Sequence, residues 1–143
     1  MAKQGKATVL NAEEHGRFLS YLATTRQPLQ NRAIYLLGYR AGLRIGSIAG
    51  LGLNDVLDPS GELKEVVHLR KDIVKNRSNY SVYLSHPELR QALLDYIAAR
   101  PESEVDNLFV SQKNTAFSAN ALSHKMLKLF REAGFDGASS HSQ

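Results

Sequence analysis

The sequence predicts an α+β fold that is mostly helical and carries a small antiparallel sheet or β-hairpin. Apolar residues recur at helical spacing in the first third of the chain and again after residue 86. Between these regions, residues 64–85 are rich in β-branched and aromatic residues, which favours strands. Such segregation of helices and strands is typical of the α+β class. The 143 residues, 43% of them hydrophobic and 22% charged, fit a single domain with a hydrophobic core.

The first expected element is a helix over the segment LNAEEHGRFLSYLATT. Asn11 is a natural N-cap, and Glu14 follows it at the spacing of a capping box. Phe18 and Leu22 then recur on one face, which is the face we expect to be buried.

A second, largely buried helix is expected over the segment NRAIYLLGYRAG. Pro28 suits its first position, because proline has no backbone N–H to leave unpaired there. Ile34 and Leu37 lie on one apolar stripe, and Gly42 is the expected C-terminal stop.

Beyond that glycine the sequence predicts a short helix from about Ile45 and then a turn at residues 58–61. The turn has the sequence DPSG, and it separates the helices from the strands. Strands are expected near residues 66–69, 73–75 and 80–84, with NRSN as a hairpin loop.

Helices resume in the last third of the chain. HPELRQALLDYIAA is an amphipathic segment that begins with Pro87, and NLFVSQ fits a short strand or a buried connector. The segment SANALSHKMLKLFREAG predicts a final long helix, with Ser118 as its N-cap and Gly134 as its stop.

Composition bounds the function. The absence of cysteine excludes disulfides and thiolate metal sites, and it fits a reducing cytoplasm. The five histidines lack metal-ligand spacing and no glycine-rich phosphate loop occurs, so we expect neither a metal nor a cofactor. No apolar run is long enough for a membrane span, and the first ten residues lack the apolar region of a signal peptide. The net charge of +4 favours a polyanionic partner.

Three side chains are candidates for chemistry on an anion. Arg44 follows a glycine stop between two packed helices, where a planar guanidinium suits two phosphate oxygens. Lys75 precedes the expected hairpin loop and offers a point charge or a general acid. His141 lies two residues from the last residue given. The alternative for each is an ordinary solvated side chain with no function.

The order of these residues and their surroundings resembles the tyrosine recombinase (phage integrase) family. YRAGLRIGSIAGLGLNDV resembles the family's first arginine box, and VKNRSNYSVYL its lysine-bearing β-hairpin. NLFVSQKNTAFSANALSHKMLKLFREAGF resembles the strand and long helix before the histidine box, and SSHS the start of that box. The boxes occur in the family's order from about Thr8 to the last residue.

The resemblance implies a tyrosine-recombinase catalytic fold and DNA strand exchange. In this family a tyrosine hydroxyl attacks a scissile phosphate and forms a 3′-phosphotyrosine, so neither ATP nor a metal is needed. Arg44 would be the first phosphate clamp, Lys75 the acid for the leaving oxygen, and His141 the first member of the histidine box.

The chain also departs from the family pattern. The second arginine, three residues after the histidine, would fall beyond Gln143, and the six tyrosines all lie upstream of the expected nucleophile. They fit packing positions better, and Ser47 replaces a customary acid. We therefore expect a partial catalytic domain, C-terminally truncated before the second arginine and the nucleophile and inactive alone. Residues 1–10 are expected to form a tail or linker, and residues 135–143 a flexible tail.

The resemblance also implies contacts with double-stranded DNA and the company of other recombinase protomers. The helix that begins after Ser118 would approach the major groove, with Asn120 and Lys125 as base or backbone contacts and Ser118 as a phosphate contact at the helix start. Lys71 and Arg77, near the hairpin, could touch the DNA backbone. A solvated helix face is the alternative for Lys125.

Three hypotheses follow from the sequence. The first is a DNA-binding fragment of a site-specific recombinase from a phage or mobile element. The second is a naturally shortened, non-catalytic DNA-binding module that competes with a full-length recombinase. The third is a basic α+β protein with no DNA role, in which Arg44 and Lys75 are incidental.

Overall fold

A computed structural model describes residues 10–69 and 81–135 of the chain. The described part confirms the predicted class, since it contains helices and a two-stranded antiparallel sheet. In chain order the elements are α1 (Ala12–Leu22), α2 (Pro28–Ala41), α3 (Ile45–Gly50), α4 (Leu53–Val56), β1 (Val66–His68), β2 (Ser81–Tyr83), α5 (Pro87–Ala99) and α6 (Ala119–Glu132).

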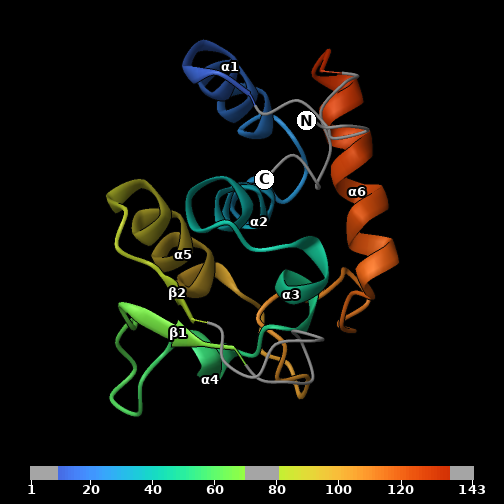
Figure 1. Ribbon diagram of the computed structural model, residues 1–143. Helices are drawn as coiled ribbons and strands as arrows, with labels where there is room; N and C mark the ends of the chain where they lie inside the picture. Colours follow the sequence, from blue (N-terminus) through green and yellow to red (C-terminus); the bar gives the residue numbers. More distant parts are fainter. Residues whose placement is uncertain (1–9, 70–80, 136–143) are drawn as a thin grey trace.

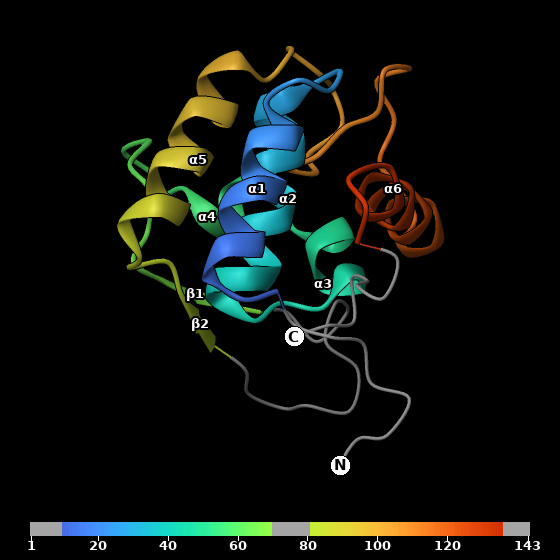
Figure 2. The ribbon, with the colours of Figure 1, turned by 90° about the horizontal axis from the view of Figure 1, so that it is seen from above.

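Helix α2 forms the centre of the molecule, and α5 and α6 lie on opposite sides of it (Figure 1 and Figure 2). Its sequence explains this position, because the segment from Ala33 to Gly38 is buried on every face. Helix α1 packs against α2, and the short α3 lies between α2 and α6 (Figure 2). The central position of α2 thus accounts for its burial on every face.

The helix ends follow the local signals in the sequence. Asn11 caps α1, because its side-chain oxygen accepts a hydrogen bond from the Glu14 backbone N–H at 2.9 Å. In turn, the Glu14 carboxylate accepts a hydrogen bond from the Asn11 backbone N–H, also at 2.9 Å. Helix α2 begins at Pro28 and ends at Gly42, whose φ of 74° is the left-handed conformation that glycine adopts without strain. Ser118 caps α6, as predicted.

Among the described residues, the sheet consists of two of the predicted strands. Strand β1 pairs with β2, with Val67 opposite Val82, and both valines are buried. The predicted strand at residues 73–75 and the NRSN loop lie outside the described residues. The NLFVSQ segment forms the buried connector rather than a strand, because its pairing is limited to isolated bridges.

An aromatic cluster in the core joins the first helix, α1, to the last helix, α6. Phe18 of α1 stacks on Phe130 of α6 with ring centroids 4.5 Å apart, and Tyr35 of α2 meets Phe18 edge-on at 4.8 Å. These contacts hold α6 against the body. None of the helices in residues 10–69 and 81–135 has both the length and the apolar character needed to cross a bilayer.

Candidate nucleic-acid interface

Arg44 lies on a rigid elbow between α2 and α3. Gly42 ends α2, Leu43 is 1% exposed and anchors the turn in the core, and Arg44 itself is the N-cap of α3. The Arg44 backbone is extended, with φ −76° and ψ 156°, and its side chain is exposed. The fold thus fixes the backbone on both sides of a guanidinium that faces solvent.

The Arg44 guanidinium also differs from most other arginines in its partners. Within the described part of the chain the guanidinium makes no hydrogen bond or ion pair, so no described residue occupies its five N–H donors. Five arginines, in contrast, are bonded to carboxylates or backbone carbonyls: Arg17, Arg32, Arg40, Arg90 and Arg100.

The start of α6 lies beside the start of α3 (Figure 1). A Cβ built on Gly46 would lie 3.7 Å from the Cβ of Ala119, which shows how closely the two first turns approach. Ser118 and Asn120 are exposed at this end of α6, and the Ser118 hydroxyl accepts the Ala121 N–H at 3.0 Å. The fold therefore brings two predicted DNA contacts to the helix end next to the Arg44 elbow.

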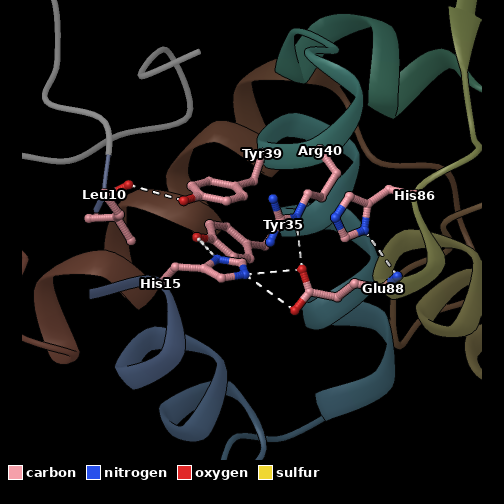
Figure 3. Close-up of polar contacts among 7 residues, drawn as sticks. All are labelled: Leu10, His15, Tyr35, Tyr39, Arg40, His86 and Glu88. Carbon is pink, nitrogen blue, oxygen red and sulfur yellow. Dashed lines mark hydrogen bonds and ion pairs between the residues drawn. The ribbon is translucent and has the colours of Figure 1, made fainter. Parts of the chain in front are cut away.

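A polar network holds the last turns of α2, from which this elbow starts (Figure 3). His15 of α1 is 6% exposed, and its Nδ1 lies 2.8 Å from the Tyr35 hydroxyl. Its Nε2 lies 3.1 Å from the carboxylate of Glu88 on α5, which also accepts a hydrogen bond from Arg40 Nε at 2.8 Å. Tyr39 stacks on His15 with centroids 4.1 Å apart. The network ties α2 to both neighbours just before the chain turns at Gly42.

The chemistry of the network fixes the direction of one bond. An ionised Glu88 carboxylate only accepts, so the His15 Nε2–H donates to it. Burial raises the pKa of Glu88, but hydrogen bonds from Arg40 and His15 outweigh it and leave this pKa below its usual value. Burial also raises the pKa of Tyr35, which keeps its hydroxyl protonated.

Lys125 is turned toward α2 and is only partly exposed. Its Nζ donates to Oε1 of Gln30 on α2 at 2.8 Å, and it lies 5.2 Å from the centroid of the Phe117 ring. Burial lowers the pKa of Lys125 to about 8. Its predicted contact with DNA would require the ammonium to leave Gln30, and that contact stays a prediction.

Four predicted site residues lie outside the described residues: Lys71, Lys75, Arg77 and His141. Their predicted roles stay predictions, as do the predicted tails at residues 1–10 and 135–143. Ser47, which stands at the family's acidic position, is 6% exposed on α3.

The sequence analysis did not single out the residues that support the site. Two of the supporting contacts join residues that are far apart in the chain. His15 and Glu88 are 73 residues apart, and Gln30 and Lys125 are 95 residues apart. A sequence signal did exist for His15, since it falls on the apolar face of a predicted helix, close to Phe18. Nothing local marks Gln30 as the partner of a lysine in the last helix.

Comparison with known proteins places this geometry among recombinases. A model of the phage integrase family matches residues 8–143. The solved XerA recombinase is 19% identical with a TM-score of 0.76, over 96% of this chain and 47% of that chain. The Tn1549 transposon integrase, solved with a circular intermediate DNA, is 17% identical with a TM-score of 0.72, over 99% of this chain and 51% of that one.

A third similar structure is a lambda integrase dimer bound to a COC′ core site. It is 14% identical with a TM-score of 0.70, over 99% of this chain and 39% of that chain. The chain thus spans about half the length of these recombinases or less. At such identities the likeness establishes the fold. A search of curated proteins gave no match.

Proposed function

The chain belongs to the phage integrase family, and from this premise we propose that it is a DNA-binding part of a site-specific tyrosine recombinase. The whole recombinase would cut and rejoin double-stranded DNA through a 3′-phosphotyrosine intermediate. In that reaction a tyrosine oxygen forms a bond to phosphorus while the bond to the 5′ oxygen breaks, so the energy of the phosphodiester is conserved.

The proposed roles follow the charge that develops on the phosphate. The Arg44 guanidinium would bind non-bridging oxygens through two parallel N–H donors, from a backbone position that the elbow fixes. Lys75 would protonate the leaving 5′ oxygen, and His141 would add a further donor to the phosphate. We assign no nucleophile among the tyrosines of this chain.

The proposed DNA contacts centre on the first turn of α6. Asn120 is exposed there and has the donor and acceptor that pair with adenine, and the Ser118 hydroxyl proton can bond a phosphate oxygen. Lys71 and Arg77 would contact the backbone from the segment between β1 and β2. We propose other copies of a recombinase as further partners, since the similar lambda integrase was solved as a DNA-bound dimer.

The observation that carries the proposal is the exposed guanidinium of Arg44, held on a fixed backbone beside the start of α6. An arginine that served stability would bond within the chain, as Arg90 and Arg100 do. A cation that no described residue neutralises, on a fixed backbone, suits a bound phosphate.

The test is duplex binding by the full chain and by Arg44→Gln, measured by fluorescence anisotropy at low and moderate salt. We expect roughly tenfold weaker binding, because a charge-assisted bond to phosphate contributes about 1.5 to 3 kcal/mol. The slope of log affinity against log salt should fall by about one. Arg17→Gln is the matched control: it removes the same charge, but Arg17 already pairs with Glu13 and lies over the Phe135 ring.

Equal losses in the two variants would show that net charge alone attracts DNA, and the Arg44 assignment would fall. Affinity that ignores ionic strength, or the absence of duplex binding, would instead support the third hypothesis, a basic protein without a DNA role. The non-catalytic module that competes with a full-length recombinase shares the binding result. It predicts that added chain inhibits strand exchange by a complete recombinase on the same sites.

A further inference from the structure

A groove of about 650 Å³ runs between α6 and the connection from α1 to α2. The turn that precedes α6 also lines it, through residues 111–113 and Phe117. Lys125, whose contact with DNA stays a prediction, does line the groove, but Arg44, Ser118 and Asn120 do not. The size of the groove is within the usual range for small-molecule sites.

The groove has an excess of positive charge. Arg26, Lys113, Lys125 and Lys128 line it, and in the described part of the chain none of these four lies within ion-pair distance of a carboxylate. The acid among the lining residues is Glu132, which already accepts a hydrogen bond from the Tyr21 hydroxyl at 2.7 Å. The lining therefore attracts an anion.

Lys125 is the groove cation whose charged form a bound anion would stabilise most. It is partly buried, and burial alone lowers its pKa to about 8. Its hydrogen-bond acceptor, Gln30 Oε1, is neutral, and Gln30 is itself held by its Nε2 donating to the Val110 carbonyl at 2.8 Å. A desolvated ammonium without a counter-ion is costly, so an anion in the groove would offset that cost.

The wall next to Lys125 offers an unused acceptor. Asn31 is 1% exposed, and its Nδ2 donates to Thr25 Oγ1 and to the Arg26 carbonyl, each at 2.9 Å. Its Oδ1 has no hydrogen-bond partner among the described residues. Asn31 and Phe117 both line the groove, and Phe117 supplies an apolar surface beside the cations.

We propose that this groove binds a small phosphate monoester, with Lys125 as its buried counter-ion and Arg26, Lys113 and Lys128 around it. A phosphate fits better than a carboxylate because it presents two charges and three acceptor oxygens to several cations at once. The organic part of the ester would lie against Phe117 and near Asn31. This inference goes beyond the proposed DNA binding and does not depend on it.

The test is a titration of the full chain by calorimetry at constant ionic strength, with adenosine 5′-monophosphate, inorganic phosphate and uncharged adenosine as probes. We expect saturable binding of the monophosphate, weaker binding of phosphate and none of adenosine. Lys125→Gln should weaken monophosphate binding by at least about tenfold, since charge-assisted bonds are the strong ones. Arg131→Gln is the control, because Arg131 is exposed on the same helix and outside the groove lining.

Two results would overturn the proposal: no saturable binding of the monophosphate or phosphate, or equal affinity in wild type and Lys125→Gln. If Lys125→Gln fails to fold, Arg26→Gln takes its place and should weaken binding severalfold. Failure here is distinct from failure of the proposed function, because saturating monophosphate should leave duplex binding unchanged. Displacement of the monophosphate by DNA, with both lost in Lys125→Gln, would instead assign the groove to the DNA surface and end the proposal.

Discussion

At the scale of single residues, the arginines of this chain divide by what their guanidinium groups bond. Arg100 donates to three backbone carbonyls, those of Val105, Asn107 and Leu108, at 2.6 to 3.0 Å. It thereby closes the connector after α5 onto the end of that helix. Arg44 has the same guanidinium group but bonds no carbonyl among residues 10–69 and 81–135. The two residues therefore allow a stabilising arginine to be compared with the one that we propose binds phosphate.

We expect Arg100→Met to lower the free energy of unfolding by roughly 2 to 3 kcal/mol, because it removes three hydrogen bonds from a charged donor and takes this donor from the Val105 and Asn107 carbonyls, whereas the Leu108 carbonyl keeps the Tyr96 hydroxyl. Methionine keeps much of the apolar stem. Urea unfolding followed by circular dichroism measures the change. Arg44→Met is the matched control and should stay within about 0.5 kcal/mol of the unaltered protein, as exposed substitutions usually do. A similar loss of stability in Arg100→Met and Arg44→Met would contradict the distinction between a stabilising arginine and one that binds a ligand.

Residue roles were only partly predictable from the sequence. The position of Arg44 after a glycine stop predicted its exposure at a helix start, and the structure places it there. The inward turn of Lys125 was not predictable, because its partner Gln30 lies 95 residues away and helical spacing alone allows a lysine beside an apolar stripe to point either way.

At the scale of elements, one carboxylate joins three helices. Glu88 in the first turn of α5 accepts hydrogen bonds from His15 of α1 and Arg40 of α2, at 3.1 and 2.8 Å (Figure 3). Because the Glu88 side chain is only 26% exposed, these bonds are less screened by water than those of a surface pair. The network therefore contributes to the packing that places the elbow after α2.

We expect Glu88→Gln to destabilise the fold by about 1 to 2 kcal/mol at neutral pH. The folded-state pKa of Glu88 lies below its unfolded value, so its contribution is present above about pH 4.5 and is lost as pH falls through the folded pKa. The difference between the unaltered protein and the variant should thus shrink in acid. Unfolding measured from neutral pH to pH 3 checks this.

Glu13→Gln serves as the control for that experiment. Glu13 also pairs with an arginine, but at 3.6 Å and with its side chain 78% exposed, so its loss should change stability little at any pH. A constant difference between Glu88→Gln and the unaltered protein down to pH 3 would show that the Glu88 charge makes no contribution.

Element boundaries were predictable where a local signal sets them. Asn11, Pro28, Gly42 and Ser118 each begin or end a helix through their own backbone or side-chain chemistry. Helix α4 was not predicted, because its first turn depends on a bond between distant segments, from the Leu53 N–H to the Asp106 carbonyl at 2.8 Å. The short sheet was predicted by β-branched composition, but its register was not.

At the scale of the whole molecule, the hydroxyls of the tyrosines are used to join distant segments. Tyr21 bonds Glu132 of α6, Tyr35 bonds His15, Tyr39 bonds the Leu10 carbonyl, and Tyr96 bonds the Leu108 carbonyl, at 2.7 to 3.1 Å. Tyr83 differs from the packing role predicted for it. It is 65% exposed, because it points outward from β2 while its neighbour Val82 fills the core.

These positions argue against a nucleophile among the described tyrosines. A nucleophilic tyrosine must reach a phosphate and lose its proton, but burial raises the pKa of Tyr35 and Tyr96 above the usual range. For Tyr21, burial and the bonded Glu132 carboxylate raise the pKa as well. We therefore expect the 143-residue chain by itself to bind DNA and to form no covalent phosphotyrosine adduct.

The check uses labelled duplexes of random sequence that carry single nicks, so that a cleaved end cannot be rejoined and an adduct accumulates. After denaturation in detergent, we expect no labelled band at the mass of chain plus DNA, whereas a complete recombinase on its own site provides the positive control. Tyr83→Phe is the decisive variant, since Tyr83 presents its hydroxyl to solvent. An adduct that this substitution abolishes would make Tyr83 a nucleophile and replace the binding role proposed here with a catalytic one.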